Sequence, residues 1–143
     1  MISIAIISNP DKISGKLTNL FTNSPAYHIG FVDLENNKFY DQNLLFRRRR
    51  WPHYKADHVR MYECPVLVSS EYLENRLDTD TDTYGVFDYL SFAFKGWLFK
   101  SRPSFKGSIC SEKVEQILMD NGWKSPFKWT PSPADFEKVL TPL

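Results

Sequence analysis

Two short segments rich in aromatic and β-branched residues constrain the fold more strongly than any other part of the sequence. They are residues 27–33, YHIGFVD, and residues 38–42, KFYDQ, and a stretch of four residues, LENN, connects them. Two such runs separated by a short turn predict a β-hairpin. Because side chains alternate between the two faces of a strand, His28 and Gly30 should share one face of this hairpin.

The other predicted strands also lie in the first half of the chain, whereas most predicted helices lie in the second half. Residues 2–8 form a continuous β-branched run that is typical of a strand covered on both faces, and residues 59–68 alternate apolar with polar side chains as far as Pro65. Apolar spacing and helix-start signals predict helices in five segments, namely residues 11–25, 69–77, 84–99, 108–120 and 130–140. This order predicts an α+β fold, and 143 residues are expected to form a single domain over residues 1–143.

The balance of charge excludes binding that depends on a large electrostatic field. Eighteen basic and seventeen acidic residues leave a net charge of +1, so nucleic acid is not an expected partner unless a local patch binds it. The two cysteines lack the C-x-x-C or histidine-rich spacing of a zinc site, and no metal or other cofactor is expected. The N-terminus lacks the features of a signal peptide and no long apolar run follows. A cytoplasmic protein without a membrane span is therefore expected, with delivery outside the cell by another route left open.

Cys110 is the residue most suggestive of chemistry, because it stands at the start of the fourth predicted helix. Backbone N–H groups and the positive end of the helix dipole stabilise a thiolate at such a position. A cysteine nucleophile also needs a base, and His28 on the hairpin is better placed than His53 or His58, which lie in a segment without a clear strand or helix pattern. Asp41, on the second strand of the hairpin, could orient the imidazole. A lone cysteine on an apolar helical stripe is more commonly a core residue, so composition alone leaves both interpretations open.

Several short motifs, taken in their order along the chain, resemble one family of cysteine hydrolases. They are YHIGFVD, FYDQ, GSICSEKVEQIL and TPSPADF, together with the tyrosine-containing segment YGVFDYLSF before the cysteine. The series is similar to the circularly permuted branch of the NlpC-type papain-like fold, which includes the YaeF/YiiX-like proteins and the lecithin:retinol acyltransferase group. In that branch a strand with His-x-Gly comes first, a polar residue on the next strand follows, and Cys-Ser-Glu at a helix start comes last. The resemblance covers nearly the whole chain.

The resemblance implies a circularly permuted papain-like α+β fold, in which a small antiparallel sheet packs against the helix that carries the cysteine. It also implies that Cys110 is the nucleophile, that His28 is the general base and then the general acid, and that Asp41 is the orienting residue. Tyr27, next to His28, could hydrogen-bond the substrate or its oxyanion, or could simply pack against neighbouring side chains. Cys64 has apolar neighbours and is expected to be an inert, packed thiol.

The strongest local charge signal is a run of four arginines, Arg47, Arg48, Arg49 and Arg50, between two aromatic residues. In an extended segment, alternate arginines would point to opposite faces and be partly solvated. Because the run follows the strand that carries Asp41, it could instead line a substrate cleft and select an anionic peptide or acyl substrate.

The resemblance implies hydrolysis of an amide, namely a peptide, γ-glutamyl or isopeptide bond of the cell-wall type, through an acyl-enzyme. A thioesterase or a lipid acyltransferase would use the same cysteine and histidine. A different class also fits the sequence: a catalytically inactive papain-like scaffold that binds a protein or nucleic-acid partner through the arginine run.

Overall fold

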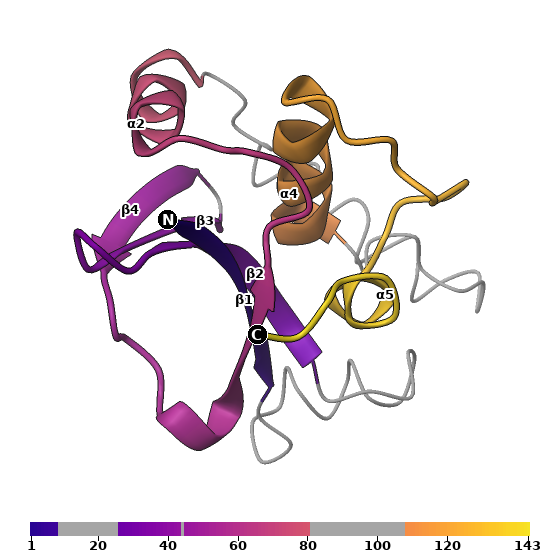
Figure 1. Cartoon of the computed structure of the whole chain (residues 1–143), viewed down its shortest axis with the longest axis horizontal. Helices are drawn as coiled ribbons and strands as arrows, with labels where there is room; N and C mark the ends of the chain where they lie inside the picture. The colour runs from indigo at the N-terminus through magenta and orange to yellow at the C-terminus, as the bar shows by residue number, and fades with distance from the viewer. Residues whose placement is uncertain (9–25, 44, 81–107) are drawn as a thin grey trace, which may run out of the picture.

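The computed structural model describes residues 1–8, 26–43, 45–80 and 108–143, and these residues form an antiparallel sheet with helices beside it (Figure 1). The strands are β1 (Ile2–Ser8), β2 (Ala26–Asp33), β3 (Lys38–Gln42), β4 (Phe46–Arg50) and β5 (Val59–Glu63). Their order across the sheet is β4-β3-β2-β1-β5, and every neighbouring pair is antiparallel. The helices in these ranges are α2 (Ser70–Thr79), α4 (Ser108–Asp120) and α5 (Pro133–Glu137), with a short 3-10 helix η1 (Ala56–His58). The predicted α+β class is therefore confirmed.

The predicted hairpin is present as β2 and β3, and Asp33 builds its turn. The Asp33 carboxylate accepts hydrogen bonds from the backbone N–H groups of Glu35 and Asn36 and from the Asn36 side chain. Asn37 adopts a left-handed conformation with φ of 54°, which asparagine tolerates better than most residues. The turn thereby determines which residues of β2 and β3 lie opposite each other.

β1 lies between β2 and β5 in the interior of the sheet, as its β-branched run predicts. Ile4 and Ile6 pack with side chains of α2, α4 and α5 in the larger hydrophobic cluster, and α4 and α5 lie on the same side of the sheet (Figure 1). We call this side the helix face. Ala5 and Ile7 point to the opposite side, where they pack in a smaller cluster with Phe39, and we call that side the Phe39 face.

Two predicted segments have different ends in the structure. β5 ends at Glu63 rather than continuing to residue 68, because Pro65 has no N–H group to donate to a sheet ladder. α2 continues to Thr79 instead of ending at residue 77, and the Ser69 side chain caps its start by accepting a hydrogen bond from the Tyr72 N–H group.

The two helices of the C-terminal part begin at the residues that their sequence signals indicate, but α5 spans only Pro133–Glu137 and is shorter than the predicted segment of residues 130–140. α4 ends at Asp120, just before Gly122, whose φ of 97° is the left-handed conformation common after a helix end. α5 begins at Pro133, and a reciprocal pair of hydrogen bonds between Ser132 and Asp135 caps it. The helices predicted for residues 11–25 and 84–99 lie outside the described residues. In the part of the chain that is described, no helix is long and apolar enough to cross a membrane.

Candidate active site

His28 lies near the start of β2, beside an irregularity in the sheet. The residues of β1 and β2 pair one to one as far as Ile7 and His28, and then Ser8 pairs with Ala26, so Tyr27 has no opposite residue on β1. A bulge of this kind bends the strand and changes the direction of the side chains next to it. The His28 side chain is largely buried, with 12% of its surface exposed.

Asp41 binds His28 across the hairpin. Asp41 pairs with Gly30 in the sheet, and residues two apart on a strand share a face, so Asp41 and His28 are diagonal neighbours on the Phe39 face. His28 Nε2 lies 2.6 Å from Asp41 Oδ2, and the Asp41 side chain is 0% exposed. The hairpin thus brings together two of the residues that the sequence singles out.

The two members of this pair stabilise each other's charged form. Burial alone would lower the pKa of His28, but hydrogen bonds with Asp41 and with Cys110 outweigh it and raise that pKa to about 9. Burial alone would raise the pKa of Asp41, but hydrogen bonds from His28 and Arg47 outweigh it and lower that pKa to about 2. At neutral pH, His28 is therefore protonated and Asp41 is ionised.

Cys110 lies in the first turn of α4, and its thiol is within hydrogen-bonding reach of the His28 imidazole. Because Nε2 of His28 faces Asp41, Nδ1 is the ring nitrogen left for the sulfur. The backbone N–H group of Cys110 belongs to the helix turn whose N–H groups have no acceptor within the helix. Cys110 is buried and belongs to the larger hydrophobic cluster. It therefore contacts both the core side chains and the imidazole of His28.

Two of the four arginines bind Asp41. Arg47 lies opposite Asp41 in the sheet and donates from Nε to Oδ1 at 3.0 Å and from Nη2 to Oδ2 at 3.1 Å. Arg49 Nη2 lies 2.8 Å from Oδ2, the same oxygen that contacts His28. The sequence did not predict these contacts, which make Asp41 the shared acceptor of two guanidinium groups and one imidazole.

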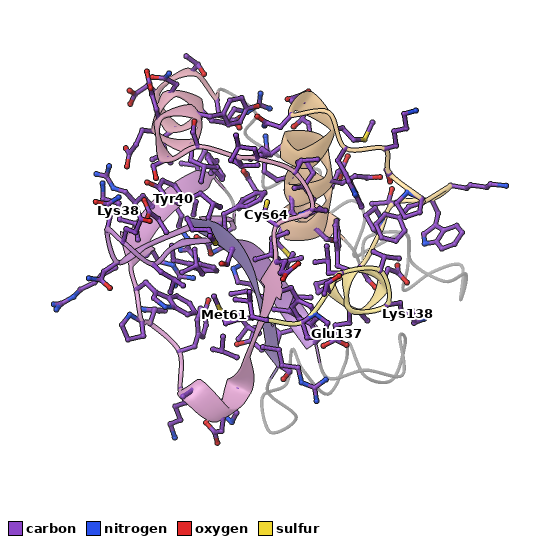
Figure 2. The ribbon with its side chains drawn as sticks, viewed as in Figure 1. Lys38, Tyr40, Met61, Cys64, Glu137 and Lys138 are labelled. Carbon is purple, nitrogen blue, oxygen red and sulfur yellow. The ribbon has the colours of Figure 1, made fainter. Side chains whose placement is uncertain are left out.

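Arg48 lies on the helix face and belongs to a separate cluster around Glu74 of α2. Glu74 accepts hydrogen bonds from Tyr40 Oη at 2.6 Å, from Lys38 Nζ at 3.1 Å and from Arg48 Nη1. Figure 2 labels Lys38 and Tyr40, which lie on the part of the sheet nearest α2. The side chain of Arg50 is exposed. The arginine run therefore alternates between faces as an extended segment does, and Arg47 and Arg49 are the members on the Phe39 face with His28.

Aromatic side chains surround the imidazole and the Arg49 guanidinium. The ring centroids of Phe39 and Tyr54 lie 6.1 and 6.3 Å from that of His28. The Arg49 Cζ atom lies 5.5 Å from the Phe39 ring centroid and 5.3 Å from that of Tyr54, whose hydroxyl accepts a hydrogen bond from Arg49. Tyr27 stacks beside His28 with a centroid distance of 6.4 Å. Tyr54 is a part of this site that the sequence did not indicate.

Gly30 allows the Phe39 ring to lie across β2. A Cβ atom at this position would lie 2.6 Å from two ring carbons of Phe39 and 2.6 Å from the backbone oxygen of Tyr40. Residue 30 of the His-x-Gly motif must therefore be glycine for a steric reason, because no side chain fits between β2 and this ring. The ring in turn packs against His28.

The two other histidines lie apart from the Asp41 pair. His53 packs edge to face against Tyr54, with a centroid distance of 5.0 Å. His58 is the last residue of η1, and its Nε2 lies 3.7 Å from Asp57 Oδ2. In the described ranges, no three or more histidine, cysteine or acidic side chains are grouped so that they could hold a metal ion.

Cys64 provides an internal contrast to Cys110. It follows β5 and lines a groove of about 570 Å³ whose lining includes neither His28 nor Cys110. Burial raises the pKa of Cys64 to about 11, so its thiol is protonated at neutral pH.

Comparisons of the chain with protein-family models, with curated proteins and with solved structures gave no match in any of the three. The geometry of the site is therefore the basis on which a function can be assigned.

Proposed function

We propose that this chain is a cysteine hydrolase with a circularly permuted papain-like fold, and that it cleaves an amide bond through an acyl-enzyme on Cys110. The observation that supports this proposal most directly is the contact between Cys110, in the first turn of α4, and an imidazole that Asp41 holds in a buried hydrogen bond. A nucleophile next to a base, with the base next to an orienting group, is the arrangement by which such enzymes activate a thiol.

The order of the elements supports the permuted form of the fold. β2 with His28 and β3 with Asp41 come before α4 with Cys110, which is the reverse of the order in papain. α4 also packs against β2 and β3 of the antiparallel sheet, as the resemblance implies.

In the first half of the proposed reaction, the proton that His28 carries at neutral pH is the one that the Cys110 thiol has given up, and the sulfur attacks the carbonyl carbon of the amide. A C–S bond forms, and the electron pair of the carbonyl π bond moves to the oxygen. The Cys110 N–H group can donate a hydrogen bond to this oxyanion, because it has no acceptor within the helix.

In the second half, the C–N bond breaks as the His28 imidazolium gives its proton to the leaving nitrogen. A water molecule then gives a proton to the neutral imidazole and attacks the thioester; the C–S bond breaks, the carboxylic acid is released, and the starting pair of Cys110 sulfur and His28 imidazolium is restored. Asp41 remains ionised throughout and stabilises the imidazolium. Because the pKa of His28 is about 9, the imidazole carries the required proton at neutral pH.

Alkylation of the two cysteines tests the proposal. Iodoacetamide at neutral pH should label Cys110 much faster than Cys64, because a pKa of about 11 keeps the Cys64 thiol protonated, whereas the Cys110 sulfur lies next to the His28 imidazole, an arrangement that activates a cysteine. His28→Gln should slow the labelling of Cys110 by about tenfold or more and leave that of Cys64 unchanged. Equal, slow labelling of both cysteines in the folded protein would refute a cysteine hydrolase.

Trapping of the acyl-enzyme identifies the bond that is cleaved. The protein is mixed with cell-wall peptides, acyl thioesters and phospholipids, quenched in acid and digested, and the Cys110 peptide is analysed by mass spectrometry. A peptidyl adduct that is absent in Cys110→Ala would support the amide hydrolase. A fatty-acyl adduct would instead assign the chain to the thioesterases or lipid acyltransferases.

A further inference from the structure

A single buried carboxylate faces three cationic side chains in the site. Asp41 contacts Arg47, Arg49 and His28. The guanidinium groups are always charged, and a pKa of about 9 keeps His28 protonated at neutral pH. Even if the Cys110 thiolate is counted, the described residues of the site contain three positive groups and two negative ones. Partly buried charge without a counter-ion is unfavourable, so the site would be stabilised by an anion.

Arg47 is the cation of this cluster that a ligand can reach. Its Nε and Nη2 atoms both bind Asp41, and within the described ranges Nη1 has no hydrogen-bond acceptor. The side chain of Arg47 is 37% exposed, compared with 19% for Arg49, which lies against the rings of Phe39 and Tyr54. Arg49 therefore contributes charge from within the site, whereas Arg47 presents a donor at its surface.

Arg47 also lies on the same face of the sheet as His28, towards the same end. Asp41 pairs with Gly30 on one side and with Arg47 on the other, so the line of site residues crosses from β2 through β3 to β4. Neighbouring strands are about 4.8 Å apart, which places Arg47 about 10 Å from the strand of His28. Two to three residues of an extended peptide span that distance.

We propose that the substrate carries a carboxylate close to the scissile bond, and that Arg47 binds this carboxylate while Arg49 adds positive potential beside it. The inference rests on the proposed function, because it specifies the substrate of the Cys110 site. Guanidinium groups bind carboxylates through charge-assisted hydrogen bonds. The substrate would therefore be an acidic peptide, or a peptide with a free carboxylate near the bond that is cleaved.

Two alkylating reagents that differ in charge test this inference without any turnover. Iodoacetamide is neutral and iodoacetate is anionic, and both react with the same thiolate. The ratio of their rate constants at Cys110 is measured in the folded protein and in the urea-unfolded chain, which serves as the reference. We expect folding to increase the preference for iodoacetate by about three- to thirtyfold, the range that Coulomb attraction at such distances gives. N-bromoacetylglycine and its amide extend the carboxylate towards Arg47 and should show at least the same preference.

Arg47→Gln should remove a large part of this preference, whereas Arg48→Gln, the same charge change on the other face of β4, should leave it unchanged. The ratio cancels any change in thiolate reactivity, so a disturbed Asp41–His28 pair would not mimic the effect. Arg47→Lys keeps the charge and should keep most of the preference.

An unaltered ratio in Arg47→Gln, with Cys110 still labelled rapidly, would overturn the inference and leave the proposed hydrolase intact. Slow labelling of Cys110 by both reagents in the native protein would overturn the proposed function itself. Protection of Cys110 by inorganic phosphate, but not by acetate, would contradict a carboxylate substrate.

Discussion

Asp41 and Glu74 are both bound by arginines of β4, but they lie on opposite faces of the sheet and in different surroundings. Arg47 and Arg49 bind Asp41, whose side chain is 0% exposed, whereas Arg48 binds Glu74, whose side chain is 33% exposed. The pKa of each carboxyl group is lowered to about 2.

The same pKa has different causes in the two clusters. At Asp41, burial favours the neutral acid, and the carboxylate persists because His28 and the arginines outweigh burial. At Glu74, hydrogen bonds from Tyr40 and Arg48 lower the pKa, burial opposes them less, and water screens the ion pairs. The two carboxyl groups therefore have similar pKa values because both have strong hydrogen-bond partners. The free energy that each set of partners contributes to folding should differ, because water can replace the partners of Glu74 more easily than those of Asp41.

Asp41→Asn should lower the free energy of unfolding more than any other substitution in the two clusters. The substitution keeps the size of the side chain but leaves Arg47, Arg49 and His28 without their counter-ion. Loss of one partner from a buried ion pair costs about 3–5 kcal/mol, and we expect about 3 kcal/mol because water partly screens Arg47. Urea denaturation followed by circular dichroism measures the free energy of unfolding. A loss below about 1 kcal/mol would mean that Asp41 behaves like a surface carboxylate.

The pH dependence of the free energy of unfolding should also distinguish the two clusters, because His28 belongs to the Asp41 cluster. Its pKa rises from 6.5 in the unfolded chain to about 9 in the folded protein. The stability gained from this proton is therefore fully present below about pH 6.5 and is lost as the pH rises through about 9, a decrease of about 3 kcal/mol at most. The free energy of unfolding should fall over this range in the native protein and stay level in His28→Gln. Cys64 lowers the free energy of unfolding only above about pH 9, where its thiol ionises in the unfolded chain but stays protonated in the folded protein up to about pH 11.

Gly30→Ala should destabilise the Phe39 face by overpacking rather than by loss of charge. The added methyl group would lie 2.6 Å from both the Phe39 ring and the Tyr40 backbone oxygen, and the backbone cannot move aside cheaply. We expect a cost of about 1–3 kcal/mol in urea denaturation. Slower alkylation of Cys110 should accompany it, since the displaced ring packs against His28. A variant as stable as the native chain would show that Phe39 can repack freely.

The contact between His28 and Asp41 could be predicted from the sequence because it depends on local features. A short turn and the two-residue period of the strands place both side chains on one face. The contact between Cys110 and His28 joins parts of the chain that are far apart, and no local pattern specifies it. The residues alone suggested His28 as a base for Cys110 but left a core role for the cysteine open, and the order of the motifs, which resembles the permuted papain-like family, favoured the contact.

The contacts of Arg47 and Arg49 with Asp41 were not predicted, because the register of β3 and β4 was not apparent. The connection between these strands, Asn-Leu-Leu at residues 43–45, lacks the glycine-containing signatures that identify hairpin turns. The alternation of the arginines could be foreseen from the geometry of a strand. Which of the arginines would lie on the same face as Asp41 depended on the pairing of Asp41 with Arg47 in the sheet. That pairing is a feature of the tertiary structure.

Glu74→Gln should have the smallest effect and is the matched control for Asp41→Asn, because both replace a carboxylate by its amide. The glutamine amide can still accept a hydrogen bond from Tyr40, and water can solvate Arg48, whose side chain is 47% exposed. Exposed ion pairs contribute about 0–1 kcal/mol, so the free energy of unfolding should fall by less than about 1 kcal/mol in urea denaturation. The difference should shrink further in high salt, which screens exposed charges more than buried ones. If Glu74→Gln instead cost as much as Asp41→Asn, burial would not determine how strongly each carboxylate stabilises the fold.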